Sequence, residues 1–378
     1  MKRLLVVPLA LVAALAGGAV RIVQDQCGPF TDVSPLYCPY VLEAYYTGIT
    51  AGTSPTTFSP DLPITRAQSA VFTTKALNQT LARGSRRAAL GQWWTTTPHY
   101  AQGLGVVSDA WGPVCADGSD LWVNGSSGVN RIRASDGRLL ETWLNYGGYL
   151  VSAMGRTFIA TTNSPGELLM IDPSQAPATP VLLADNLGNQ PTSLAFDGAR
   201  LWTANKDGSI SIVTPQATTP WPVTTVTEGL TGPFGLVYDG TNMWVTDTPV
   251  HKIHRLDANG AILQSVDTGD SPQYPAFDGQ NIWVPNCCQV VLITASTGVP
   301  LDVVVGNGLS NPKGAVFDGR RMMLLSGNSD QIWVFDAATL APASSGPVSL
   351  GSGTYLQGAA SDGIDFWITL GNGQMGRY

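Results

Sequence analysis

The chain contains the stretch Phe196-Asp197-Gly198-Ala199-Arg200-Leu201-Trp202, and close variants of it recur along most of its length. In each clear copy, Asp-Gly is followed by two variable residues, an apolar residue and usually Trp. These copies are marked by Asp117, Asp197, Asp239, Asp278, Asp318 and Asp362, and a degenerate copy begins at Met154. From residue 117 onward the spacings are 37, 43, 42, 39, 40 and 44 residues, so the region consists of seven similar units.

Each unit has the composition of a small antiparallel sheet. Asp-Gly marks a sharp turn, and the aspartate carboxylate can accept hydrogen bonds from the turn amides. Short β-prone runs follow the Trp, as at residues 210–213 and 223–226 of one unit and 252–256 and 262–266 of the next. Such a period is typical of a β-propeller, whose blades pack on one another through large apolar residues. We therefore predict a mainly β fold, a seven-bladed β-propeller over residues 92–378, preceded by a small α-helical module.

The two ends of the propeller complement each other in the sequence. The last unit stops at residues 374–378, which supply a third strand and no fourth. The segment 93–97 is β-prone and precedes the first complete unit. We predict that this segment completes the seventh blade, because closure removes exposed sheet edges.

The N-terminus has the pattern of an export signal. Met1-Lys2-Arg3 is basic, residues 4–15 are apolar, and small residues follow. We predict a signal peptide over residues 1–19 and an extracellular or cell-envelope location. The alternative is an uncleaved anchor, because residues 4–20 reach the short limit for crossing a bilayer. No later stretch is apolar for long enough, so we expect no transmembrane helix in the mature chain.

Five cysteines are present. Export permits disulfides, and Cys27 and Cys38 close a short loop, so we predict that these two form a disulfide. Cys115, Cys287 and Cys288 are left without an assigned state. The adjacent Cys287 and Cys288 cannot bond to each other without strain.

Residues 28–81 differ in pattern from the repeats. Apolar residues recur there at helical spacing, and Thr65 and Gln68 have the spacing of a helix-capping box. The runs Phe30-Thr-Asp32-Val33, Tyr46 to Gly52, Phe58-Ser-Pro60 and Ile64 to Gln68 resemble one S-layer homology repeat. The remaining short stretch before the propeller, residues 82–91, is polar and reads as a linker.

The S-layer homology resemblance implies attachment to cell-wall polysaccharide or another envelope component. Arg66 occupies the position at which family members contact glycan. A single copy is present where three are usual, and Gln68 stands where Glu is usual. We expect the lone module to tether or oligomerise the protein, and the alternative is that a single copy no longer binds wall glycan. The alternative role of Arg66 is to stabilise the helix N-terminus.

The repeats resemble the group of seven-bladed propellers that includes NHL-repeat, YncE-like and virginiamycin B lyase-like proteins. Lyase-like members use His and Glu with a divalent cation. Here only Glu141, Glu167 and Glu228 follow residue 90, and no His-x-Glu pair is present. The resemblance therefore implies the fold more strongly than the activity.

A polar residue follows the Trp position in every unit, and these residues are Asn124, Asn163, Asn205, Asp247, Asn286, Asn328 and Asn372. Together they could bind a polar ligand or cation on one face of the ring, or each could cap its own turn. We take Asn124, Asn205, Asp247, His251, Asn286 and Asn328 as candidate ligand-binding residues, and assign no catalytic residue or metal ligand.

The net charge and the absence of known catalytic motifs in the sequence exclude several classes of function. Lys and Arg total 20 against 27 Asp and Glu, for a net charge of −7, which argues against nucleic-acid binding. No nucleophile elbow, phosphate-binding loop or zinc-binding helix is recognisable. We expect an exported binding or scaffold protein with an unidentified propeller ligand or protein partner and no cofactor. A divalent cation is the alternative to no cofactor, and an exported lyase, lactonase or glycan-active enzyme is the alternative function.

Overall fold

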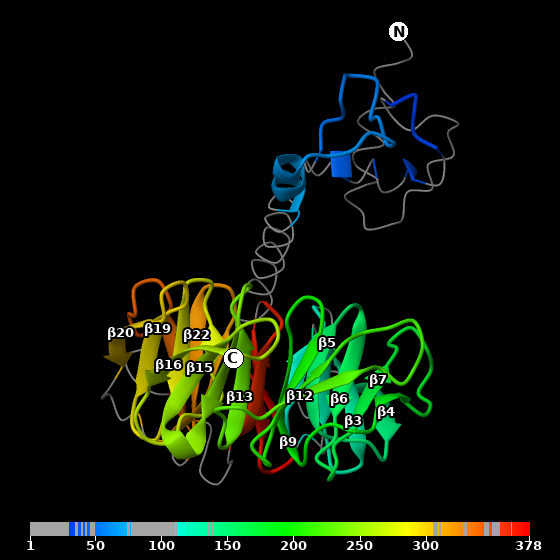
Figure 1. Ribbon diagram of the computed structural model, residues 1–378. Helices are drawn as coiled ribbons and strands as arrows, with labels where there is room; N and C mark the ends of the chain where they lie inside the picture. Colours follow the sequence, from blue (N-terminus) through cyan, green and yellow to red (C-terminus); the bar gives the residue numbers. More distant parts are fainter. Residues whose placement is uncertain are drawn as a thin grey trace. The chain divides into compact units, whose positions relative to one another are not determined.

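The structure is a computed structural model of the chain. It describes residues 30–34, 37–38, 41, 44–45, 50–73, 76 and 110–378, except for 111, 119, 135–136, 138, 305–308, 310, 328–330, 344–347, 350–355 and 364. Two compact units are distinguished, residues 1–93 and residues 94–378, and each is described by itself (Figure 1).

The second unit consists of seven antiparallel sheets, which we number as blades 1 to 7 in chain order. The first four contain β1 (Val114–Ala116), β2 (Asp120–Asn124), β3 (Gly128–Arg133), β4 (Leu139–Leu144); β5 (Tyr149–Ala153), β6 (Arg156–Ala160), β7 (Leu168–Ile171), β8 (Val181–Ala184); β9 (Pro191–Phe196), β10 (Leu201–Asn205), β11 (Ile210–Val213), β12 (Val223–Val226); and β13 (Pro233–Tyr238), β14 (Met243–Asp247), the 3-10 helix η1 (Thr248–Val250), β15 (Lys252–Leu256) and β16 (Ile262–Asp267). The last three contain β17 (Ala276–Phe277), β18 (Asn281–Pro285), β19 (Val290–Thr294), β20 (Val299–Val304); β21 (Pro312–Phe317), β22 (Arg321–Ser326), β23 (Gln331–Asp336), β24 (Val348–Ser349); and β25 (Leu356–Ser361), β26 (Phe366–Leu370) and β27 (Met375–Arg377).

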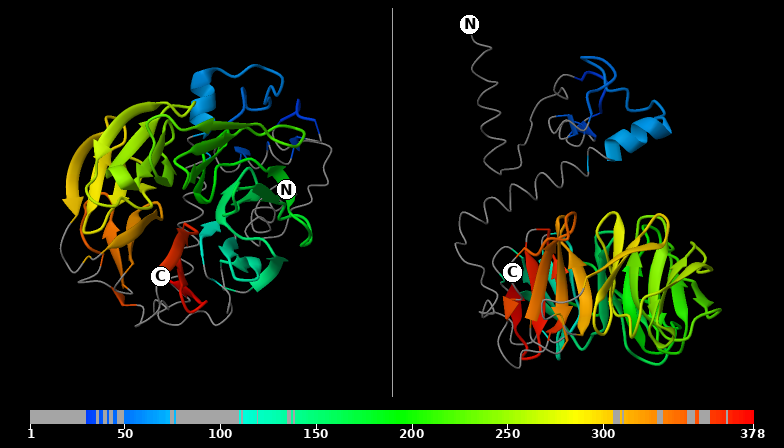
Figure 2. Two further views of the ribbon diagram at one scale, coloured as in Figure 1. Left: turned by 60° about the horizontal axis from the view of Figure 1, so that its bottom comes forward. Right: turned by 90° about the vertical axis from the view of Figure 1, so that its left-hand side faces the viewer.

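The sheets form a closed ring. The first strand of each blade contacts the first strand of the next, and β25 of blade 7 contacts β1 of blade 1. The left view of Figure 2 shows the sheets around a common centre, with the red C-terminal strands beside the cyan first blade. The predicted seven-bladed propeller is confirmed.

The Asp-Gly turns explain why the repeat folds as it does. Gly198 has a φ of 91°, which lies in the left-handed region that glycine tolerates. The Asp197 carboxylate accepts the amides of Ala199 and Arg200 at 2.8 and 2.6 Å. Its other oxygen accepts the indole N–H of Trp202 at 2.7 Å, a bond that the sequence did not reveal. The same Asp–Trp bond recurs at Asp117–Trp122, Asp239–Trp244, Asp278–Trp283 and Asp362–Trp367.

The Trp side chains pack between neighbouring blades, as predicted. Trp202 of blade 3 is 1% exposed and belongs to a cluster with Leu236 and Met243 of blade 4. Trp367 of blade 7 clusters with Leu121 and Val123 of blade 1 and so contributes to ring closure. Burying aromatic surface between blades stabilises units that could not form a core alone.

The predicted closing strand, residues 93–97, lies outside the described residues. The chain enters blade 1 beside blade 7, because Ala110 donates its amide to the Gly373 carbonyl at 2.9 Å. Thr369 of β26 donates its hydroxyl to the Gly112 carbonyl at 2.8 Å. The entry segment of blade 1 is therefore bonded to the last blade, while β25, β26 and β27 form a three-stranded sheet in the part of the chain that is described.

The first unit contains a small aromatic core and a short helix. Phe30 is buried and makes edge contacts with Tyr45 and Phe58. Asp32 accepts the amides of Phe58 and Ser59 at 2.8 and 2.7 Å, and these bonds, the Phe58 amide first, lower the pKa of its carboxyl.

The helix covers residues 66–73 and starts at the predicted capping box. Gln68 donates its amide to Thr65 Oγ1 at 3.1 Å, and Thr65 donates its amide to Gln68 Oε1 at 2.8 Å. Cys38 is disulfide-bonded, whereas its expected partner Cys27, the predicted signal peptide and the predicted linker lie outside the described residues. Within the described ranges, no helix is long and apolar enough to cross a membrane.

Candidate functional site

The predicted ring residues that the structure describes lie at or shortly after the ends of the second strands, and their side chains are bonded within their own blade or to an adjacent loop. Asn124 Oδ1 accepts the Gly148 amide at 3.1 Å, and Asn286 Oδ1 accepts the Cys288 amide at 3.1 Å. Asn205 is buried and donates from Nδ2 to the hydroxyls of Ser209 and Ser211, both at 3.0 Å. Of these bonds, the one to Asn286 is that of a turn cap, whereas Asn124 is bonded to the loop that enters blade 2 and Asn205 to two serines of its own blade.

The ring residues are not brought together by any bond that the structure gives for Asn124, Asn205, Asp247 and Asn286. Asn328 lies outside the described residues. A shared ligand role for the ring therefore stays a prediction, and the observed contacts bind each side chain to nearby backbone or side-chain groups.

Asp247 forms a buried polar group with His254. Its carboxylate accepts the amides of Thr231 and Gly232 at 2.7 and 2.9 Å, and Oδ2 lies 3.6 Å from His254 Nε2. Burial alone would raise the pKa of Asp247, but His254 and the two amides outweigh it, so the pKa is lowered. The Nδ1 atom of His254 lies 2.8 Å from Ser265 Oγ, which places this histidine in the packing of blade 4.

His251 lies on the surface of the same blade. It follows η1 with a φ of 60° and directly precedes β15, so it lies just outside the strand. Its side chain is 55% exposed, and Nδ1 lies 3.3 Å from Asp270 Oδ1. His251 is thus accessible to a ligand, and His254 is not.

An aromatic group occupies the centre of the ring, and sequence reasoning missed it. The hydroxyl oxygens of Tyr149 and Tyr274 are 2.9 Å apart, although these residues belong to blades 2 and 5. Tyr274 also donates to the Thr192 carbonyl of blade 3 at 3.2 Å, and its ring centroid lies 4.7 Å from that of Phe234 in blade 4. Three aromatic side chains, from blades 2, 4 and 5, and a backbone carbonyl of blade 3 therefore meet at the centre.

The aromatic centre can make packing contacts and hydrogen bonds, and it is not suited to acid–base catalysis. Burial, followed by the nearby Tyr149, raises the pKa of Tyr274 far above its usual value. A tyrosine in that state keeps its proton at neutral pH, so it is unsuited to act as a general base there. The position could not be found from the repeat, because Tyr274 aligns with a serine, Ser193, in blade 3.

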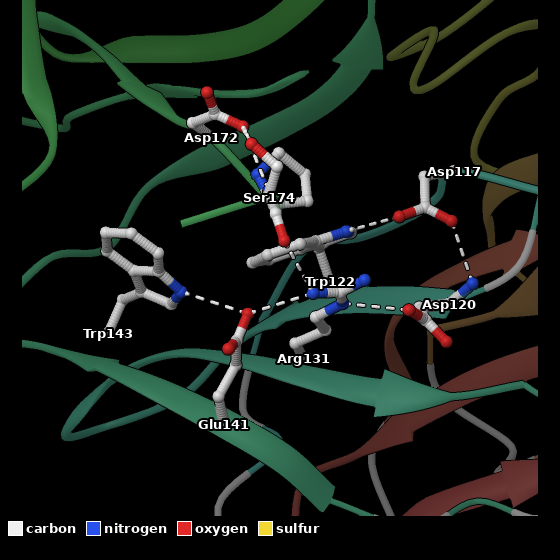
Figure 3. Close-up of polar contacts among 9 residues, drawn as sticks. Asp117, Asp120, Trp122, Arg131, Glu141, Trp143, Asp172 and Ser174 are labelled. Carbon is white, nitrogen blue, oxygen red and sulfur yellow. Dashed lines mark hydrogen bonds and ion pairs between the residues drawn. The ribbon is translucent and has the colours of Figure 1, made fainter. Parts of the chain in front are cut away.

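A third polar group links the outer parts of blades 1 and 2 (Figure 3). Arg131 lies over the Trp122 ring at 5.3 Å from its centroid. Its Nε donates to Asp120 at 2.8 Å, and one terminal nitrogen donates to Glu141 at 3.2 Å and to the Pro173 carbonyl at 3.0 Å. The two carboxylates are thus paired with one guanidinium, which is an arrangement that stabilises the blade interface rather than one poised for acid–base catalysis.

Metal binding finds no support among the described residues, where no group of three or more His, Cys, Asp or Glu side chains is arranged to hold an ion.

Comparison with known proteins identifies the first unit. Residues 29–70 match the model of the S-layer homology domain. The chain carries an S-layer homology domain. The matched range includes residues described above: Phe30 and Phe58 form the core, Asp32 joins two segments by hydrogen bonds, and Thr65 and Gln68 cap the helix.

Solved structures share the fold of the second unit. A streptogramin B lyase aligns with a TM-score of 0.59 at 13% identity, covering 73% of this chain and 95% of that one. A catalytically inactive virginiamycin B lyase from Staphylococcus aureus with quinupristin gives 0.60 at 15%, covering 73% and 97%. The WD40 propeller domain of Doa1 gives 0.57 at 11%, covering 74% and 96%. A search of curated protein sequences found no match.

Proposed function

We propose that the protein is exported and held at the cell envelope by its S-layer homology domain, and that its propeller displays a binding or scaffold surface. The observation that carries the proposal is the domain match together with its intact framework of Phe30, Asp32 and the Thr65–Gln68 cap. The proposed ligand of this domain is cell-wall polysaccharide.

Arg66 is the residue of this domain that we propose contacts the glycan. It is exposed at the first turn of the helix, and Ile64, two residues earlier in the chain, is 57% exposed. An exposed guanidinium and an exposed apolar side chain in one short segment suit a sugar polymer, which offers hydroxyl and anionic groups as well as apolar faces. A purely structural role at the helix N-terminus is the alternative that the experiment has to separate.

The experiment is co-sedimentation of the purified protein with isolated cell envelopes. We expect residues 20–378 to sediment with the envelopes and residues 92–378 to stay in solution. Arg66→Ala is expected to weaken sedimentation at least tenfold while helix content and melting temperature are unchanged. Arg320→Ala is the matched control, because Arg320 is an 83% exposed arginine of the propeller. Equal binding of both lengths would contradict the proposal.

The alternative function is an exported enzyme with its site in the ring, and the lyase fold neighbours are the reason to test it. The groups described at the centre, Tyr149, Tyr274 and Phe234, favour ligand contact over acid–base chemistry. A lyase that uses a divalent cation should gain thermal stability with Mg²⁺ and lose it with a chelator. We expect no such shift in melting temperature, and a clear shift would favour the enzyme.

A further inference from the structure

The turn between β18 and β19 of blade 5 carries two adjacent thiols whose sulfur atoms are held together. Cys287 and Cys288 are both free, and Cys288 is exposed. Their Sγ atoms are 2.7 Å apart. That separation is only a little longer than the about 2.05 Å of a disulfide bond.

The backbone around the pair is anchored on both sides. Cys287 donates its amide to the Asp270 carbonyl at 3.0 Å and accepts the Asn311 amide at 3.0 Å. Cys288 donates its amide to Asn286 Oδ1, and the buried Asn286 donates to the Thr268 carbonyl. The turn is thus bonded to the segments that enter blades 5 and 6. The backbone that carries the two sulfurs is therefore fixed by the frame of the blade.

We propose that Cys287 and Cys288 form a thiol–disulfide exchange site that is converted reversibly into a vicinal disulfide by an external low-molecular-weight disulfide. The exposed Cys288 thiolate attacks one sulfur of the external disulfide, forming a mixed disulfide and releasing one thiol. Cys287, as thiolate, then attacks the Cys288 sulfur and releases the second thiol. Two cysteine thiols and one external disulfide become one internal disulfide and two external thiols, so protons and electrons balance.

The Cys287–Cys288 disulfide can form, but strain makes it easy to reduce. The Cα atoms of adjacent residues are about 3.8 Å apart across a trans peptide, which is below the about 4.4 Å at which ordinary disulfides begin. A strained disulfide is easier to reduce than a relaxed one. The pair is therefore suited to cycle between two states, unlike a structural disulfide.

The pKa of Cys287 agrees with its role as the second, resolving thiol. The hydrogen bond with Cys288, then burial and the charges of Cys288 and Asp270, raise it to about 11. A thiol with a raised pKa is mostly protonated at neutral pH and is a poor first attacker. Cys115 is more extreme, because burial, with the nearby Asp117, raises its pKa far above its usual value, and we expect it not to react.

The test uses the full chain and oxidised glutathione as the probe. After incubation, the protein is denatured in acid and its free thiols are labelled with a maleimide. Of the three free cysteines in the described residues, we expect only one to be labelled after incubation, with no increase in dimer. Mass spectrometry should show a peptide spanning residues 287–288 that has lost two hydrogens. Mild reduction should restore both labels while the Cys38 disulfide persists.

Single variants separate exchange from simple oxidation. Cys287→Ser should stop the reaction at a stable glutathione adduct on Cys288, because the resolving thiol is gone. Cys288→Ser should leave Cys287 unmodified, and the control Cys115→Ser should still lose two labels. A stable glutathione adduct on the unaltered protein, or a disulfide between two chains through Cys288, would overturn the proposal.

Discussion

Blades 3 and 5 are built on the same repeat, yet they differ in their first strands. Blade 3 has a six-residue first strand that begins at Pro191, whereas the first strand of blade 5 has two residues and begins four residues after Pro272. Pro275 lacks the amide that a ladder needs, so Tyr274 bonds through its backbone to Lys313 and Ala315 of blade 6 instead. The Asp–Trp turn is the same in both blades. The Asp–Trp turn and the packing between blades are therefore what the ring depends on. Tyr274 and the cysteine pair occur at positions where blade 5 departs from the repeat.

The largest expected effect is on the shared part of the two blades. Trp202→Ala in blade 3 and Trp283→Ala in blade 5 should each lower the free energy of unfolding by about 3–5 kcal/mol, because a large cavity opens between blades. Urea unfolding followed by circular dichroism measures the change. A loss confined to one blade would show that the two interfaces are not equivalent.

The next effect is that of the turn aspartate. Asp197→Ala leaves two turn amides and the Trp202 indole without their acceptor, and we expect a loss of about 1–3 kcal/mol. Asp278→Ala is the counterpart in blade 5 and should cost a similar amount. If either variant unfolds at the same urea concentration as the parent, the carboxylate is not what stabilises the turn.

The same aspartate predicts a pH dependence. Burial would raise the pKa of Asp197, but the amides of Arg200 and Ala199, the Trp202 indole and the Arg200 charge outweigh it, so the pKa is lowered from 3.8. Its contribution to stability is therefore complete above the pKa of the unfolded chain and is lost as pH falls through the lower pKa of the folded state. Unfolding curves between pH 5 and pH 2 should show a smaller loss for Asp197→Asn than for the parent protein.

A smaller effect concerns the centre of the ring, to which blade 5 contributes the Tyr274 side chain and blade 3 only a backbone carbonyl. Tyr274→Phe removes the hydrogen bonds to Tyr149 and the Thr192 carbonyl, and we expect a loss of about 0.5–1.5 kcal/mol. Combined with Tyr149→Phe in a double-mutant cycle, it should show coupling of about 0.5 kcal/mol or more. Strict additivity would mean that the two hydroxyls do not depend on each other.

The smallest expected effect is that of the exposed thiol. Cys288→Ser should change the free energy of unfolding by less than about 0.5 kcal/mol, because surface substitutions outside special features usually do. Chemical denaturation under reducing conditions tests this. A large loss would assign Cys288 a structural role and set blade 5 further apart from blade 3.

Much of the fold could be predicted from local pattern. The Asp-Gly turn, the Trp after it and the third and fourth strands of blades 3 and 4 lie where the repeat places them, because each depends on residues within one unit. The capping box at Thr65 and Gln68 was equally predictable, since its two bonds join residues three apart. The short first strand of blade 5 could not be predicted in this way. Pro272 stands at the same position as the Pro of the neighbouring units and suggests a strand of the same length, but Pro275 has no amide for the ladder immediately before the strand.

The sequence by itself determined the number of blades, the bonds from the turn aspartates to the turn amides and the S-layer homology domain, since each depends on residues close in the chain. Only the tertiary structure decided that Tyr149 meets Tyr274 at the centre and that Cys287 is bonded to Asp270 and Asn311. These contacts join residues of different blades or of the segments between blades. Such residues come together only when the ring closes, and the sequence of a single repeat does not determine that.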